Sequence, residues 1–224
     1  MLLAIDTATR TAGLALYDEE KGRVLGEETW HSVNNHTVEL TPRLVGMLEQ
    51  QGCSPVDLTG LVVSLGPGSF TGLRIGLGVA KGLALSLGIP LVGIPTLDIV
   101  ARPHKGQRLP IWAILQAGRS RICVGHYVRR RGRWRRHGEY RLTTLQQLCE
   151  EEQEPALFCG EIESADARLI RESLGSGVSI ATPAFSLRRA AHLAELGWER
   201  LAKGDVDNAA SLAPIYLQTP AIHA

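Results

Sequence analysis

Residues 66–74, with the sequence Gly-Pro-Gly-Ser-Phe-Thr-Gly-Leu-Arg, place three glycines between an apolar run and a long apolar stretch. Glycine lets the backbone approach a ligand closely and a helix N-terminus attracts anions, so a loop of this kind can cradle nucleotide phosphates. However, Pro67 removes an amide donor, no Gly-Lys-Ser/Thr follows, and the strand at 91–94 has no acid for a ribose. We therefore expect a tight strand-to-helix turn with Ser69 as N-cap, or a partner surface, rather than a dinucleotide site.

A second candidate for phosphate chemistry follows the first apolar run, where Asp6, Thr7 and Thr9 form a polar turn. In two-lobed ATPases such a turn holds phosphate with hydroxyls and amides while the acid manages the metal. Those enzymes need a matching acid in the first turn of the second lobe, and Gln116 stands there instead. Asp6, Thr7 and Thr9 are thus at most a weak nucleotide site, and we expect neither a cofactor nor an active phosphotransferase.

No residues have the spacing of a metal site. A helical pair of His ligands needs a spacing of four residues, and Leu40 stands four residues after His36. The four cysteines are too widely spaced for a metal knuckle or a redox pair. We predict no bound metal, and free thiols in a reducing compartment.

The densest charge in the sequence lies at residues 129–136. This segment contains Gly132, Trp134 and six arginines, which are Arg129, Arg130, Arg131, Arg133, Arg135 and Arg136. Arginines interleaved with aromatic residues can hold a phosphate backbone and stack on bases. A solvated hairpin tip with Gly132 at the turn is slightly favoured, and RNA contact by the arginines is the second interpretation.

The composition is that of a globular protein, with 44% hydrophobic and 21% charged residues. A net charge of +1 gives no general attraction to nucleic acid or membrane. The N-terminus has no basic segment before its apolar run, and no apolar run approaches the length of a membrane span. We expect a cytoplasmic protein without membrane contact.

Apolar periodicity predicts two halves with the same order of elements: three strands, helix, strand, helix, strand, helix. In the first half these lie at 2–5, 12–17, 24–30, 36–51, 58–65, after 66, 90–94 and from 96. In the second half they lie at 110–115, 122–128, 134–142, 144–151, 156–159, 164–174, 178–180 and 187–203. The order predicts an α/β protein of two βββαβα lobes, the architecture of the actin, sugar-kinase and heat-shock-chaperone (ASKHA) ATPases. With the boundary in 101–108, the lobes are residues 1–101 and 108–224, and the C-terminal tail is free to pack back on the first lobe.

The helix after the glycine-rich turn is apolar or small nearly all round, which an ordinary surface helix is not. One stripe can pack on its own sheet, while another needs an external cover, and small residues would let a second helix approach closely. Apolar residues of the preceding helix extend the surface, since a large apolar patch is seldom left bare. The predicted partner interface comprises Leu44, Met47, Leu48, Phe70, Gly72, Leu73, Ile75, Gly76, Val79, Ala80 and Leu83.

Two segments together resemble a known family. Residues 5–9, Ile-Asp-Thr-Ala-Thr, and residues 66–76, Gly-Pro-Gly-Ser-Phe-Thr-Gly-Leu-Arg-Ile-Gly, closely resemble TsaB (YeaZ) proteins. The resemblance covers residues 1–100 well and is thinner in the second half. There the family usually opens its second lobe with Asp-Ala-Arg, where this chain has Gln116, Ala117 and Gly118.

The resemblance implies a non-catalytic subunit of the complex that makes threonylcarbamoyladenosine on bacterial tRNA, beside the anticodon. Its partners would be a catalytic TsaD-type subunit, bound through helices of the first lobe, and a TsaE-type ATPase. It would form a homodimer when alone, with tRNA as an indirect partner. Two alternatives are an autonomous ATPase or kinase of the same architecture, and a tRNA-binding module that uses the arginines of 129–136.

Overall fold

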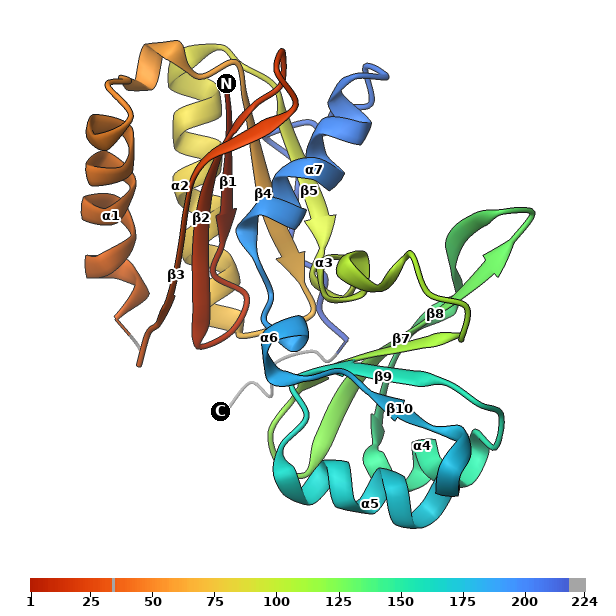
Figure 1. Cartoon of the computed structure of the whole chain (residues 1–224). Coiled ribbons are helices and arrows are strands. Elements are labelled where there is room, and N and C mark those ends of the chain that lie inside the picture. Colours follow the sequence, from red (N-terminus) through yellow and green to blue (C-terminus); the bar gives the residue numbers. More distant parts are fainter. Residues whose placement is uncertain (34, 218–224) are drawn as a thin grey trace. The chain divides into compact units, whose positions relative to one another are not determined.

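The computed structural model describes residues 1–33 and 35–217, which form two compact units. The first unit contains Met1–Ile99 and Arg188–Ile215, and the second contains Val100–Leu187 together with residues 216–217. Each unit has a five-stranded sheet of its own, with the elements labelled in Figure 1.

The sheet of the first unit has the strand order β3-β2-β1-β4-β5. Its strands are β1 (Leu2–Asp6), β2 (Thr11–Asp18), β3 (Arg23–His31), β4 (Gly60–Gly66) and β5 (Leu91–Pro95). The first three form an antiparallel meander, while β4 pairs parallel to β1 and β5 parallel to β4. The central strands β1 and β4 are buried along their whole length, so helices must cover both faces.

Helices α1 (His36–Gln50) and α2 (Phe70–Leu87) cover one face, and α7 (Ala190–Leu201) covers the other (Figure 1). Successive side chains of β1 point to opposite faces of the sheet. Leu3 and Ile5 pack in the core under α1 and α2, and Leu2 and Ala4 pack under α7. The short helices Pro55–Asp57 and α3 (Thr96–Ala101) precede β4 and follow β5.

Local signals set the ends of α2. The Ser69 hydroxyl accepts a 3.2 Å hydrogen bond from the amide of Gly72, which is the predicted N-cap. At the other end Gly88 adopts a left-handed conformation with φ 67°, which glycine reaches without steric cost.

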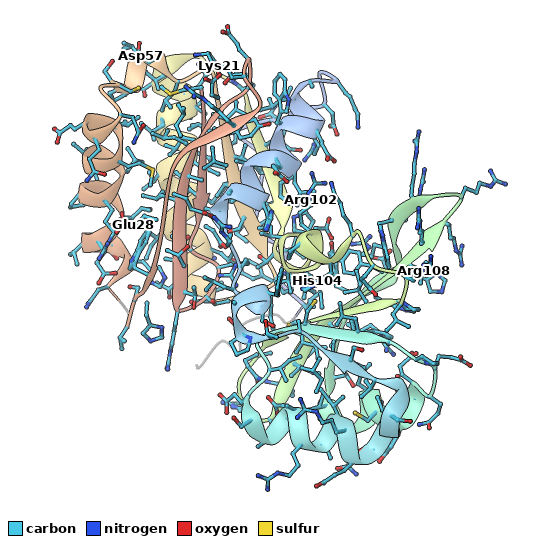
Figure 2. The ribbon with its side chains drawn as sticks, viewed as in Figure 1. Lys21, Glu28, Asp57, Arg102, His104 and Arg108 are labelled. Carbon is cyan, nitrogen blue, oxygen red and sulfur yellow. The ribbon has the colours of Figure 1, made fainter. Side chains whose placement is uncertain are left out.

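Polar contacts tie α1 to the edge strand β3. The indole nitrogen of Trp30 donates a 3.0 Å hydrogen bond to Glu39, and the guanidinium of Arg43 lies 4.7 Å from the Trp30 ring centre. Arg43 also pairs with Glu28, which projects from β3 toward α1 in Figure 2. These polar contacts and the apolar core beneath α1 together hold α1 beside α2.

The division of the chain differs from the predicted one, because residues 188–215 belong to the first unit. Helix α7 packs its small residues on β1, β2 and β5, and Gly197 lies directly against Val62 of β4. After α7, Asp207 accepts a 2.8 Å hydrogen bond from the amide of Gly93, and Arg200 donates to the Gly93 carbonyl at 2.9 Å. The predicted boundary at 101–108 allowed only the C-terminal tail to return to the first lobe and did not anticipate that α7 returns as well.

The sheet of the second unit has the order β10-β9-β6-β7-β8. Its elements are β6 (Ile111–Gln116), β7 (Arg121–Arg130), β8 (Arg133–Thr144), α4 (Leu145–Glu151), β9 (Leu157–Gly160), α5 (Ser164–Leu174), β10 (Ser179–Ile180) and α6 (Pro183–Ser186). Short 3₁₀ turns lie at Arg102–His104 and Gly175–Gly177. Its core joins Trp112, Val124, Leu148, Phe158 and Ile170, which brings α4 and α5 onto one face of the sheet.

The predicted order of elements is confirmed in both units: three antiparallel strands, a helix, a parallel strand, a helix, a parallel strand and a helix. The largest difference lies at 187–203, where α6 and α7 replace one continuous helix. The break carries Arg188, a buried residue with a role described below.

Gly197 provides a test of the α7 contact. A Cβ at this position would overlap both γ-methyl groups of Val62, which is stiff at χ1 and cannot move aside. We expect Gly197→Ala to destabilise the protein by about 1–3 kcal/mol in urea unfolding, as overpacking does. The matched control is Gly46→Ala in α1, where a Cβ meets nothing within 4 Å and the gain in helix propensity should stabilise by about 0.5–1 kcal/mol. Equal effects of the two changes would contradict this packing.

Candidate functional site

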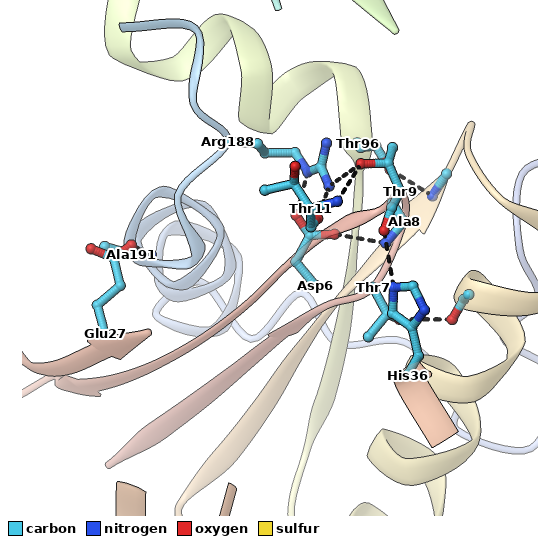
Figure 3. A network of polar contacts seen from close by, with 12 residues as sticks. Asp6, Thr7, Ala8, Thr9, Thr11, Glu27, His36, Thr96, Arg188 and Ala191 are labelled. Atoms are coloured by element: carbon cyan, nitrogen blue, oxygen red, sulfur yellow. Dashed lines mark hydrogen bonds and ion pairs between the residues drawn. The ribbon is translucent and has the colours of Figure 1, made fainter. Parts of the chain in front are cut away.

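The turn between β1 and β2 contains the three residues predicted as a weak nucleotide site, and Figure 3 shows how they are bonded. Asp6 accepts a 3.0 Å hydrogen bond from the amide of Ala8 with one carboxylate oxygen and pairs with Arg188 through the other. Both charged side chains are at most 3% exposed. The carboxylate is therefore neutralised inside the unit.

The remaining polar groups of the turn are also engaged. Arg188 donates to the Thr9 hydroxyl at 3.1 Å and to the Thr11 carbonyl at 2.7 Å. The Thr7 hydroxyl donates to the Gly72 carbonyl at 2.7 Å, and a ring nitrogen of His36 contacts the Thr9 carbonyl at 3.0 Å. The structure thus gathers Asp6, Thr7 and Thr9 around an arginine rather than around open space. Arg188 is 182 residues from Asp6 in the sequence, and no local signal identified it.

The glycines of 66–76 lie against this same turn. The amide of Ser69 donates to the Ala8 carbonyl at 2.6 Å, and a Cβ on Gly72 or Gly76 would overlap atoms of Thr7. These glycines therefore admit the β1–β2 turn of their own unit, not a second helix from a partner. The close approach was predicted correctly, but its occupant was not.

Burial corrects the predicted partner interface. Seven of its residues lie in the core of the first unit, and a partner cannot reach them there: Leu44, Met47, Leu48, Gly72, Leu73, Gly76 and Ala80. The physical reason is that α1 and α2 use these stripes to cover the sheet, with Leu44, Met47 and Ala80 in one cluster with Ile5 and Leu14.

Four predicted interface residues remain accessible. Phe70 is exposed, with Arg74 stacked 3.8 Å from its ring centre, and Ile75, Val79 and Leu83 are half-buried. Between and beyond them lie Gly78, Gly82 and Leu85, all exposed, with Leu85 at 67%. We call this surface the outer face of α2: Phe70, Arg74, Ile75, Gly78, Val79, Gly82, Leu83 and Leu85.

The outer face has the geometry that the interior glycines were expected to provide. Gly78 and Gly82 are four residues apart, hence on one side of the helix, and a Cβ at either meets nothing within 4 Å. Arg74, Gly78, Gly82 and Leu85 follow one line along the helix, flanked by apolar side chains. Neighbouring α1 adds the exposed Val38 and Val45.

Helix α2 is also long and apolar for a helix that is so little covered. Its 18 residues have a mean hydropathy of 1.3, and only 33% of them are buried. By length and composition α2 is the one helix in the described part of the chain that could cross a membrane, which corrects the expectation that no apolar run has that length. The core helix of a soluble protein can have the same length and composition.

The arginines of 129–136 lie at the tip of the β7–β8 hairpin in the second unit. Arg129 and Arg130 end β7, Arg131 forms the turn with Gly132, and β8 begins at Arg133. The hairpin tip predicted from the sequence is therefore confirmed. The pairing of the two strands gathers these arginines with one another at the end of a single ribbon.

The two five-stranded sheets with their helices define an α/β protein of two similar units, and comparisons with known proteins agree with this fold. A family model described as TsaD, tRNA N6-adenosine threonylcarbamoyltransferase, matches residues 24–223. The structure of YeaZ from Pseudomonas aeruginosa covers 96% of this chain and 99% of its own, with a TM-score of 0.80 at 24% identity. The ethanolamine utilization protein EutJ from Carboxydothermus hydrogenoformans matches with a TM-score of 0.51 at 11% identity, over 85% of this chain and 88% of its own. The fold is thus the predicted ASKHA architecture.

A sequence relative specifies the family. The chain is 34% identical over 220 residues to the tRNA threonylcarbamoyladenosine biosynthesis protein TsaB of Bacillus subtilis, a match that covers 97% of this chain and 93% of the relative. The chain belongs to the TsaB (YeaZ) family.

The Asp6–Arg188 pair gives a test of the buried turn. Arg188→Met leaves Asp6 buried without its cation, and breaking a buried pair costs about 3–5 kcal/mol. We expect urea unfolding to show a loss of that size. Adding Asp6→Asn should recover part of it, because the amide is uncharged and still accepts from Ala8. A loss below about 1 kcal/mol in the single variant, as at exposed pairs, would contradict the structural role.

Proposed function

We propose that this chain is a non-catalytic subunit of a tRNA threonylcarbamoyladenosine synthesis complex and that it binds and stabilises a catalytic TsaD-type subunit. The observation that carries the proposal is the outer face of α2, an apolar helical surface whose residues are exposed or only half-buried. A face of this kind is stabilised when a second apolar helix covers it.

The shape of the outer face favours a helix as its occupant. With no side chains at Gly78 and Gly82, a partner helix can approach the α2 backbone closely, while Ile75, Val79 and Leu83 provide apolar contact on either side. Phe70 at the N-terminal end and Leu85 at the C-terminal end extend the contact along the helix. Val38 and Val45 allow α1 to join a small helical bundle.

We propose no catalytic activity for the chain itself. An ASKHA phosphotransferase needs a free acid after its first strand, and Asp6 is buried and paired with Arg188. The complex would also contain a TsaE-type ATPase, would bring tRNA to the catalytic subunit, and would reside in the cytoplasm. No cofactor or metal is assigned to this chain.

The partner surface can be tested with variants that spare the fold. Gly78→Arg with Gly82→Arg places two long charged side chains on the outer face, where the added atoms have room and the helix propensity rises. We expect the affinity for a TsaD-type subunit, measured by calorimetry, to fall about 100-fold or more, as at interface hot spots. Thermal unfolding should be unchanged or slightly improved.

The matched control is Ala165→Arg with Ser173→Arg, two exposed positions of α5 in the second unit. It adds the same charge and should leave binding intact. If the α2 variant binds the partner as tightly as the unchanged chain, the interface lies elsewhere. Gly76→Arg is not a valid probe, because its side chain would enter the Thr7 contact.

Without the catalytic subunit, the same face should pair with itself. We expect sedimentation velocity to show a dimer of the unchanged chain and a monomer of the Gly78→Arg, Gly82→Arg variant, since the charges would be buried opposite one another. A dimer that persists in this variant would assign self-association to another surface.

A further inference from the structure

The tip of the β7–β8 hairpin extends beyond the sheet that supports it. β6 pairs with β7 only up to Tyr127, so residues 128–135 pair with nothing but one another (Figure 1). A two-stranded ribbon of this kind is only marginally stable by itself. The ribbon has no core whose burial could offset backbone strain or charge repulsion among its own residues.

The arginines of the tip introduce both charge repulsion and backbone strain. Arg130 lies directly opposite Arg133, and like charges in direct cross-strand pairs are destabilising. Arg131 occupies the first position of the two-residue turn with φ 50°, and Gly132 follows with φ 78°. Turns with two positive φ angles strongly prefer Asn-Gly or Asp-Gly, so arginine is a costly choice there.

The fold does not neutralise this charge. Within residues 1–33 and 35–217, no carboxylate forms an ion pair with Arg129, Arg131, Arg133 or Arg135. Arg136 lies 3.7 Å from Glu139 and stacks 4.2 Å from the ring centre of Tyr140. Six arginines in eight residues are thus held together on a projecting ribbon.

Pairing places three of the arginines on one face. Arg130 opposes Arg133, Arg135 is two residues further along β8, and side chains two residues apart share a face about 6.8 Å from each other. The side chains of Arg130, Arg133 and Arg135 line one hollow with that of Arg131. Guanidinium groups arranged in this way suit successive phosphates of a nucleic-acid strand, since each can bind two phosphate oxygens.

Flat rings continue the same face toward the core. The His137 ring accepts a 3.3 Å hydrogen bond from the Arg130 guanidinium and meets His126 edge-on, with centroids 5.5 Å apart. His126 in turn stacks on Trp112 at 4.3 Å. Burial, with the charges of His137 and Arg141 nearby, lowers the pKa of His126 to about 4, so this ring is neutral near pH 7. The His126 ring therefore supports the hairpin without adding to its charge.

We infer that the β7–β8 hairpin is an RNA-binding arm that holds the phosphate backbone of tRNA through Arg130, Arg131, Arg133 and Arg135. The inference rests on the proposed function, because the proposed complex brings tRNA to this chain. The contact is made to phosphates and carries no sequence preference, since these arginines are gathered around a hollow and not aligned as base-reading pairs.

A salt series with the full chain and an unmodified tRNA transcript tests the arm. Four phosphate contacts give a slope of about −3 in log K against log salt, so affinity should fall about 60-fold between about 50 and 200 mM KCl. Arg130→Gln with Arg133→Gln and Arg135→Gln should leave one contact and reduce that fall to about 3-fold. Lys105→Gln with Arg168→Gln and Arg171→Gln removes the same charge from exposed positions elsewhere in the second unit and should keep the steep slope.

A second variant separates charge from folding. Arg131→Asn keeps the turn, and asparagine tolerates its positive φ better, so thermal stability should stay or rise while tRNA affinity falls. Equal weakening by both triple variants, or a flat salt response of the unchanged chain, would overturn the arm. Tighter binding to phosphatidylglycerol vesicles than to tRNA would also overturn it, by assigning the charge to a membrane surface.

Measuring capture of the TsaD-type subunit on the same variants distinguishes the two proposals. The arm predicts that the triple hairpin variant loses tRNA and keeps the partner. If the unchanged chain captures no partner yet binds tRNA with the steep slope, the proposed function fails and the arm stands.

Discussion

The guanidinium of Arg188 neutralises Asp6 at the end of the first strand and also holds Thr9 and Thr11 across the turn. Because this turn is fixed, Thr7 can bond to the Gly72 carbonyl, and the glycine-rich side of α2 can lie against it. The buried pair thus contributes to the position of α2, together with the apolar core under Leu77, Ala80 and Ala84. The face of α2 that carries Gly72 and Gly76 is turned inward by both contacts.

The two sides of α2 use glycine for different purposes. Gly72 and Gly76 admit backbone and side-chain atoms of the chain's own β1–β2 turn, whereas Gly78 and Gly82 face open space. Helix periodicity predicted two apolar stripes, one for the sheet and one for a cover. It could not assign them, because small residues occur on both and only the tertiary contact with Thr7 distinguishes them. The sequence therefore predicted that α2 needs a cover on one side, and the glycines it assigned to that side lie against the β1–β2 turn instead.

The order of strands and helices could be predicted from the sequence, because the periodicities of strands and helices are local properties of the chain. What could not be predicted depends on long-range contact. Arg188 lies in a short break between helices, and nothing near it in sequence indicates a partner 182 residues away. Helix α7 was expected in the second lobe because it follows that lobe's strands, but its small residues fit the sheet of the first unit. Pairing between distant segments, not local structure, limited the prediction.

Each unit has a surface that is energetically unfavourable and that its own fold does not cover or neutralise. In the first unit it is apolar area on α2, which water disfavours whatever the salt concentration. In the second unit it is positive charge on a ribbon with little core, which ions screen. The two proposed occupants, a second apolar helix and a polyanion, differ accordingly, and their binding should respond differently to salt. The two surfaces are therefore separable in a single chain, so the loss of one contact does not imply the loss of the other.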